Sequence, residues 1–157
     1  MHIEHPTRVT HRYTQRLDAR PDVVFPLLCP VRECEWVAGW DPPLVLSRSG
    51  VAEEDCVFTT HDRQGSALWI VTDHDPRAFQ LRMYKIVPGM VVTRLDIRLR
   101  PDGRRRTSAE VSYSYTALSE AGGRWVADRT TEWYEEFMLE WERELNAYLQ
   151  KHTTVTR

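Results

Sequence analysis

The sequence predicts an α+β fold in which a curved antiparallel sheet of about seven strands wraps round a long C-terminal helix. Three observations lead to this prediction. A first strand-like segment is followed by two short helical pieces, six closely spaced strand-like segments come next, and the chain then shows a long helical periodicity. Strands joined by short turns form an antiparallel meander. An amphipathic helix buries its apolar stripe against one face of such a sheet.

The first elements are a strand and a proline-rich helical region. Residues 10–19 end in apolar–polar alternation, which predicts a strand. In the following segment, RPDVVFPLL, Pro21 occupies a position that favours the first turn of a helix, and Asp22 adds an acidic group there. Because Pro26 and Pro30 interrupt a longer helix, we expect two short helical pieces.

The middle of the chain has six strand-like segments, separated by turn-forming glycines and prolines. They are residues 44–50, 55–62, 67–75, 78–87, 90–100 and 106–118. The last two alternate most regularly, with one side apolar and the other charged or hydroxylated. The apolar sides are Val91, Thr93, Leu95, Ile97 and Leu99, and Ala109, Val111, Tyr113 and Tyr115. We therefore expect one sheet face in water and the other face covered.

The cover is expected to be a helix over about residues 127–151, a segment without glycine or proline. Its apolar residues recur at steps of three and four, as on one face of a helix. They are Tyr134, Phe137, Met138, Trp141, Leu145, Tyr148 and Leu149. The pair Gly122–Gly123 is predicted to lie in the turn before this helix.

This order of elements resembles the helix-grip fold of the START-like (SRPBCC) superfamily, which includes birch-pollen allergen relatives, polyketide cyclases and lipid-transfer domains. The resemblance covers about residues 9–150. Its most specific parts are ARPDVVFPLLCPVRECEWVAGWD, SGVAEEDCVFTT and WIVTDHDP, which resemble a bacterial branch. The superfamily implies a cavity between sheet and long helix that holds an apolar or aromatic small molecule. It does not imply one chemistry, because its members include carriers, sensors and cyclases.

Length and composition predict a single cytoplasmic domain over residues 1–157, with a core of about 9–150 and termini outside it. At 157 residues the chain is too short for two ordinary domains. A net charge of −2 gives no reason to expect a nucleic-acid partner, because such an interface would need a basic face. No apolar run could insert in a membrane, and the first residues have no secretory pattern. Three cysteines, an odd number, favour free thiols.

The ligand types for a tetrahedral zinc site occur in the series Cys29, Cys34, Cys56 and His61. The close C-x2-C pair that makes zinc motifs specific is absent. Buried cysteine acting as a small apolar residue is the commoner case. We therefore predict no metal site, and no motif indicates a cofactor.

The six tryptophans favour a ligand pocket, because aromatic rings offer a large apolar surface with a polar edge. The predicted ligand-binding residues are Trp36, Trp40, Trp69, Tyr113, Tyr115, Trp133 and Phe137. Trp141, further along the final helix, is predicted to lie in the core. The alternative for every one of these residues is ordinary core packing.

The favoured function is binding or carrying of an apolar, aromatic or lipid-like small molecule. A second hypothesis is a cyclase/aromatase- or dehydratase-type enzyme, although no catalytic motif identifies its residues. Its acid–base candidates are Glu33, Glu35, Asp41, His61, Asp73 and His74, with Tyr113 and Tyr115 as hydrogen-bond donors. A third is a co-chaperone-like interaction module. A homodimer stays an open alternative.

Overall fold

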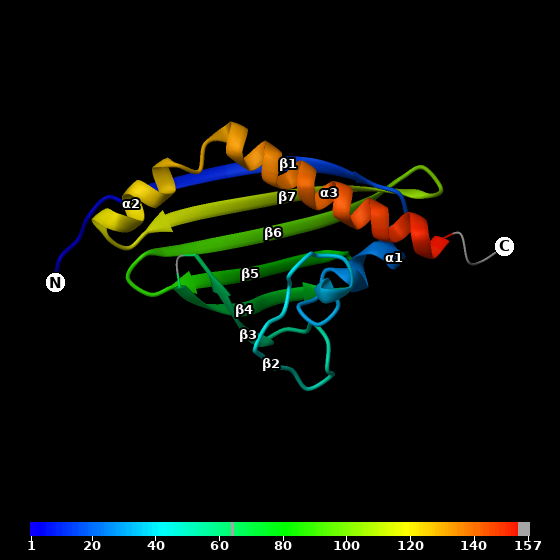
Figure 1. Cartoon of the computed structure of the whole chain (residues 1–157), viewed down its shortest axis with the longest axis horizontal. Coiled ribbons are helices and arrows are strands. Elements are labelled where there is room, and N and C mark those ends of the chain that lie inside the picture. Colours follow the sequence, from blue (N-terminus) through cyan, green and yellow to red (C-terminus); the bar gives the residue numbers. More distant parts are fainter. Residues whose placement is uncertain (64, 154–157) are drawn as a thin grey trace.

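A seven-stranded antiparallel sheet forms the body of the molecule (Figure 1). The computed structural model describes residues 1–63 and 65–153. The strands are β1 (Arg8–Leu17), β2 (Leu44–Leu46), β3 (Val57–Asp62), β4 (Gly65–Asp75), β5 (Gln80–Val87), β6 (Val91–Asp102) and β7 (Arg106–Ala117). Their order in the sheet is β1-β7-β6-β5-β4-β3-β2, so the first strand pairs with the last. The predicted meander is confirmed, and β1 and β2 form the two edges.

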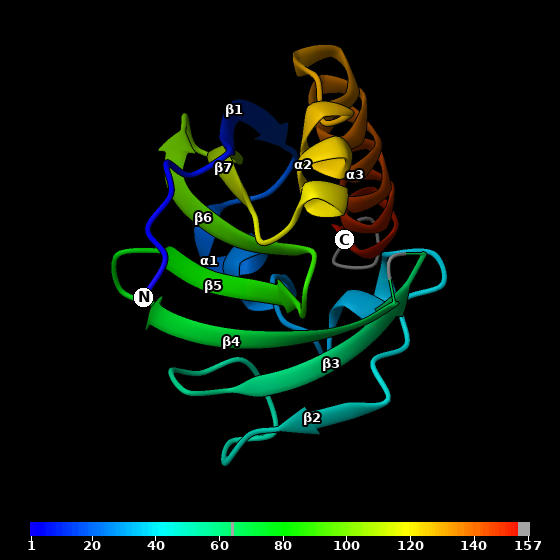
Figure 2. The ribbon, with the colours of Figure 1, turned by 90° about the vertical axis from the view of Figure 1, so that its left-hand side faces the viewer.

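The helices lie on the concave side of the curved sheet (Figure 2). Three short pieces follow β1: α1 (Pro21–Val24) and the 3-10 turns η1 (Phe25–Leu27) and η2 (Glu33–Glu35). Two helices follow β7: α2 (Glu120–Ala127) and α3 (Thr131–Thr153). Pro21 begins α1 and Asp22 lies in its first turn, as predicted. The predicted fold class is therefore confirmed.

Helix α3 packs one face on the sheet and leaves a second face partly uncovered. Tyr134, Met138, Leu145 and Leu149 are at most 2% exposed. The Tyr134 hydroxyl donates a 2.7 Å hydrogen bond to the carbonyl of Val111, which fixes the helix on β7. The residues between these, Phe137, Trp141 and Tyr148, are only partly buried. Helix α3 therefore presents aromatic side chains to a space that the core does not fill.

Helix α3 also completes hydrogen bonds at the β1 edge of the sheet. The backbone N–H of Arg16 donates to Glu142 Oε2 at 3.0 Å, and that of Asp18 donates to Asn146 Oδ1 at 2.9 Å. Asn146 Nδ2 in turn donates to the carbonyl of Arg16 at 2.9 Å. A strand edge leaves such groups unpaired unless another element covers them. Side chains of α3 take the place of a neighbouring strand at this point.

The region before α3 differs from the prediction. Residues 120–127 form a separate helix, α2, so Gly122 and Gly123 are helical and α3 begins at Thr131. Ser119 caps α2, since its Oγ accepts a 3.0 Å hydrogen bond from the Gly122 N–H. A Cβ atom on Gly122 would lie 1.9 Å from the carbonyl oxygen of Met90. Glycine is therefore needed where α2 meets the β5–β6 turn.

Candidate ligand-binding cavity

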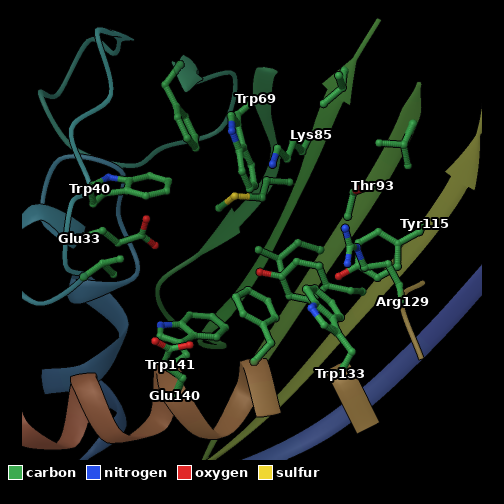
Figure 3. Close-up of a pocket in the computed structure, with 18 of the residues that line it drawn as sticks. Glu33, Trp40, Trp69, Lys85, Thr93, Tyr115, Arg129, Trp133, Glu140 and Trp141 are labelled. Atoms are coloured by element: carbon green, nitrogen blue, oxygen red, sulfur yellow. The ribbon is translucent and has the colours of Figure 1, made fainter. Parts of the chain in front are cut away.

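A cavity of about 450 Å³ lies between the concave sheet face and the helices (Figure 3). This volume falls in the range of about 300–1,000 Å³ typical of small-molecule sites. Aromatic side chains make up much of its wall. They are Trp40, Phe58, Trp69, Tyr113, Tyr115, Trp125, Trp133, Phe137 and Trp141.

Strand register builds the floor of this cavity. Phe58 pairs with Trp69, Trp69 with Lys85, Lys85 with Thr93, and Thr93 with Tyr115. These five residues form one row across β3, β4, β5, β6 and β7, and all five line the cavity. The row combines apolar rings with an amine and hydroxyl groups. Residues far apart in the sequence thus form one continuous surface.

Six of the seven predicted ligand-binding residues line this cavity: Trp40, Trp69, Tyr113, Tyr115, Trp133 and Phe137. Trp36 does not. It is 7% exposed, its Nε1–H donates to the carbonyl of Leu27 at 3.0 Å, and its ring stacks on Trp141. Trp141, predicted as a core residue, borders the cavity. Trp36 therefore lies behind the cavity wall, and Trp141 forms part of it while also packing against the core. Which tryptophans contact a ligand stays a prediction.

One wall of the cavity joins the sheet to the segment before β2. The rings of Phe58 and Trp69 stack at 5.2 Å with planes 11° apart. Trp40 meets both edge-on, at 6.2 and 6.4 Å. The Trp40 Nε1–H donates a 2.7 Å hydrogen bond to the carbonyl of Pro30, which orients the indole. These ring contacts and this hydrogen bond between the protein's own residues therefore hold this wall in place.

The opposite wall belongs to α3 and β7. The rings of Trp133 and Phe137 stack at 5.3 Å. Phe137 meets Tyr113 edge-on at 5.6 Å, and Trp133 meets Tyr115 edge-on at 6.4 Å. No hydrogen bond to either tyrosine hydroxyl is found within residues 1–63 and 65–153. Burial raises the pKa of both tyrosines, so both hydroxyls remain protonated donors.

Arg129 lies in the short link between α2 and α3 and reaches the cavity. Its guanidinium carbon lies 4.0 Å from the ring centroid of Trp125 and 4.4 Å from that of Trp133. Its Nε is buried, and no described residue accepts a hydrogen bond from it. The His11 Nε2–H donates to the Arg129 carbonyl at 2.6 Å and holds the link against β1. Arg129 and Trp125 are not among the residues predicted from the sequence to bind a ligand.

Thr93 and Lys85, two other polar residues of the cavity floor, differ from each other in their hydrogen-bond partners. Thr93 is 2% exposed, and its Oγ1 has no hydrogen-bond partner in the described part of the chain. The ammonium group of Lys85 pairs with the Asp62 carboxylate and lies 5.4 Å from the Trp69 ring centroid. The charge of Lys85 is therefore compensated within the protein.

Glu33, one of the acid–base candidates, faces the cavity from η2 (Figure 3). No hydrogen bond or ion pair to its carboxyl group is found among the residues described. The side chain keeps some accessible surface because it borders the cavity, but protein atoms crowd its other sides. This loss of hydration raises the pKa of Glu33 to about 8, so the carboxyl group is largely protonated at neutral pH.

The five other acid–base candidates do not line the cavity. Glu35 forms an ion pair with Arg32 and accepts a hydrogen bond from Tyr148. His61 bonds Ser66 at 3.0 Å in an exposed position. His74 lies against Phe25, with ring centroids 5.1 Å apart. Asp41 and Asp73 are exposed. Two further carboxylates, Glu140 and Glu144 of α3, border the cavity instead.

The three cysteines are free thiols in separate settings. Cys29 and Cys56 are buried and Cys34 is exposed. Cys29 Sγ accepts a 3.1 Å hydrogen bond from the Ala52 N–H, and Cys34 Sγ donates to the carbonyl of Val31. Within the described ranges, no three histidine, cysteine or acidic side chains gather as a metal-binding group. Nor does any helix there have the length and apolar character needed to span a membrane.

Known proteins resemble this chain in structure and not in sequence. No family model and no curated protein matches the sequence. Norcoclaurine synthase from Thalictrum flavum, in complex with dopamine and hydroxybenzaldehyde, is 10% identical with a TM-score of 0.67, over 94% of this chain and 89% of that chain. The Mll3558 protein from Rhizobium loti is 14% identical with a TM-score of 0.67, over 92% and 99%.

A third similar structure is that of Ara h 8.0201, 9% identical with a TM-score of 0.64, over 92% of this chain and 99% of that chain. All three matches extend over nearly the whole of both molecules, including the sheet and the long helix. At such low identity the likeness is one of fold. This chain therefore has the helix-grip fold that the sequence predicted.

Proposed function

We propose that this protein binds or carries an apolar, aromatic or lipid-like small molecule in the cavity between the sheet and α3. The observation that carries the proposal is the cavity of about 450 Å³ with nine aromatic side chains in its wall. A core packed to ordinary density leaves no such space. Small-molecule sites combine an apolar wall with a few polar groups, as here.

The similar structures give this proposal limited support. The norcoclaurine synthase structure named above is a complex with dopamine and hydroxybenzaldehyde, which are both small aromatic molecules. A fold of this kind can therefore belong to a protein with aromatic ligands. The likeness does not transfer a ligand or a reaction, because one fold serves many functions.

Intrinsic fluorescence provides the test, since five of the six tryptophans line the cavity. A neutral aromatic probe such as naphthalene-2-carboxamide should quench the emission saturably and raise the melting temperature. Stabilisation should approach about 2.7 kcal/mol at a hundredfold excess over the dissociation constant. Trp133→Ala and Phe137→Ala should weaken binding. Trp36→Phe is the control, because Trp36 lies outside the cavity wall.

A panel of apolar compounds that causes neither quenching nor a thermal shift would contradict the proposal. The panel should contain aromatic and aliphatic members, because the wall itself does not distinguish a ring system from an acyl chain. Quenching that Trp36→Phe weakens as much as Trp133→Ala would place the ligand elsewhere.

Acid–base catalysis in the same cavity is a second candidate, favoured by Glu33. A carboxyl group with a pKa of about 8 can donate and accept a proton near neutral pH. A cyclase/aromatase- or dehydratase-type reaction would use such a group beside a bound carbonyl compound. Glu33→Gln should then abolish turnover and leave ligand affinity nearly unchanged. If turnover survives in this variant, Glu33 is not the acid–base group.

A further inference from the structure

The polar groups of the cavity are divided between two ends. Figure 3 shows Arg129, Thr93 and Tyr115 on one side of the cavity, with Glu33 and Glu140 on the opposite side. The grouping is close in space, because Thr93 and Tyr115 are cross-strand partners. The positive charge of Arg129 also acts on the Tyr115 hydroxyl. One end therefore holds hydrogen-bond donors and the other holds carboxyl groups.

The donor end carries a positive charge that the protein does not compensate. Within the described residues, Arg129 forms no ion pair, whereas Lys85 pairs with Asp62. The two indole rings against Arg129 stabilise its charge through cation–π contacts. They supply no hydrogen-bond acceptor, since a ring face leaves the N–H groups of the guanidinium unused. A partly buried guanidinium without an acceptor for its N–H groups favours the binding of an anion.

The same end has hydroxyl groups without partners. Thr93 lines the cavity, and its Oγ1 is unpaired and turned away from the accessible surface. Rotation about χ1 would turn this hydroxyl into the cavity, where a ligand acceptor atom would remove its desolvation penalty. No described residue bonds the Tyr115 hydroxyl either, and burial keeps it protonated. Three donor groups thus converge from β6, β7 and the α2–α3 link. Such a set suits an acceptor with several lone pairs.

Among anions, the carboxylate fits this set because its single negative charge matches the one uncompensated positive charge of Arg129, whereas a phosphate monoester carries nearly two negative charges. A guanidinium offers parallel N–H groups along its edge, which match the two oxygens of one carboxylate. The remaining wall is mainly aromatic and aliphatic, and it extends from Trp133 toward Trp40 and Glu33 at the other end. An apolar body attached to the carboxylate would lie along that wall.

We propose that the ligand is a monocarboxylic acid with an apolar body, held by Arg129 through its carboxylate, with Thr93 and Tyr115 as further donors. This inference rests on the proposed function and specifies the ligand's chemistry. A charged amine would instead be attracted to Glu140 and Glu144 at the far end.

Three matched naphthalene probes test the inference: naphthalene-2-carboxylic acid, naphthalene-2-carboxamide and naphthalen-2-ylmethanamine. Decanoic acid, decanamide and decylamine form an aliphatic set. Isothermal titration calorimetry at neutral pH compares the dissociation constants within each set. In at least one set the acid should bind about ten- to a hundredfold more tightly than the amide, as charge-assisted hydrogen bonds require.

Arg129→Met should weaken binding of the acid far more than binding of the amide, so that the preference for the acid disappears. Arg124→Met is the matched control: it removes the same charge from the neighbouring α2, where Arg124 is exposed and pairs with Glu120. Thr93→Val should reduce acid affinity by a smaller factor. If Arg129→Met does not fold, the wild-type ratio of acid to amide still decides the question.

The outcomes separate the two proposals. If no probe in either set binds, the proposed function fails and this inference fails with it. If acid and amide bind equally, the cavity binds ligands but the acid preference is overturned. Tighter binding of the amines also overturns it and assigns recognition to the carboxyl end. An acid preference that survives Arg129→Met excludes Arg129 as the anchor.

Discussion

The indole rings of Trp36 and Trp141 stack with centroids 5.9 Å apart and planes 7° from parallel. Trp36 is buried behind the cavity wall, and Trp141 is partly buried and borders the cavity. This contact fastens the irregular segment between β1 and β2 to the middle of α3. This pair and the hydrogen bond from Tyr148 to Glu35 therefore hold the wall that carries Trp40 against the wall that carries Phe137.

Replacement of these two tryptophans should have unequal effects on stability. Trp36→Ala should cost about 3–5 kcal/mol of unfolding free energy, because it leaves a large void in the core. Trp141→Ala should cost less, since part of that ring already faces open space and has fewer packing partners to lose. Equilibrium denaturation in urea measures both. Equal losses would contradict the assignment of one ring to the core and the other to the cavity.

The two adjacent glycines of α2 provide a matched pair. Gly122→Ala should destabilise the protein, because the new Cβ would lie 1.9 Å from the Met90 carbonyl oxygen and the helix would have to move. Gly123→Ala has open space around it and should be neutral or stabilising by up to about 1 kcal/mol. Melting temperatures of the two variants check this. A Gly122→Ala protein as stable as wild type would show that α2 packs less closely.

Glu33 should make stability depend on pH. Its pKa is about 8 in the folded protein against an ordinary value of 4.5, so the folded chain holds the proton more tightly. The contribution of Glu33 to the free energy of unfolding is fully present below pH 4.5. It is lost as the pH rises toward 8, because ionisation of the carboxyl group is less favourable in the folded state. Glu33→Gln should remove this loss, and its advantage over wild type should grow by up to about 1.4 kcal/mol per pH unit across that range. Urea midpoints at several pH values measure the trend.

Glu35→Gln is the control for that experiment, because the pKa of Glu35 is lowered through hydrogen bonds from Arg32 and Tyr148. A lowered pKa stabilises the folded state above the ordinary value and is lost as the pH falls. Glu35→Gln should therefore be at a disadvantage at neutral pH and recover toward acid. If both variants show the same pH trend, Glu33 does not lie in a desolvated site.

Two buried hydroxyl groups on neighbouring strands should respond oppositely to removal. Thr93 Oγ1 has no partner within residues 1–63 and 65–153, so Thr93→Val should leave the ligand-free protein equally stable or more stable. Ser114 Oγ shares a 2.9 Å hydrogen bond with Thr10 Oγ1, so Ser114→Ala should cost about 1 kcal/mol. Thermal unfolding of ligand-free protein compares them. A destabilised Thr93→Val would mean that its hydroxyl is already satisfied.

The strands and α3 could be predicted because local patterns determine them. Apolar–polar alternation identified the inner face of β6 and β7, and Val91, Leu95 and Val111 are indeed buried. Helix α2 was missed because two glycines read as a turn. Gly122 is required by the close approach of Met90, which lies about thirty residues earlier and leaves no local sign in the sequence.

The cavity residues show the same limit. Aromatic content indicated a pocket, but it could not separate Trp36 from Trp141, because that distinction depends on which side of a stacked pair faces the space. Arg129 was missed since one arginine in a short link has no pattern. Its importance arises only when β7, α2 and α3 bring Tyr115, Trp125 and Trp133 around it.

The hydrogen bonds from α3 to β1 also bear on how the molecule behaves at high concentration. A strand from a second molecule could not run the length of β1 without displacing Glu142 and Asn146. The opposite margin, β2, has only three paired residues. Growth of a fibril needs a long free strand that templates the next one. The short β2 and the covered end of β1 both limit such growth, and loss of the hydrogen bonds from Glu142 and Asn146 would lengthen the free edge of β1.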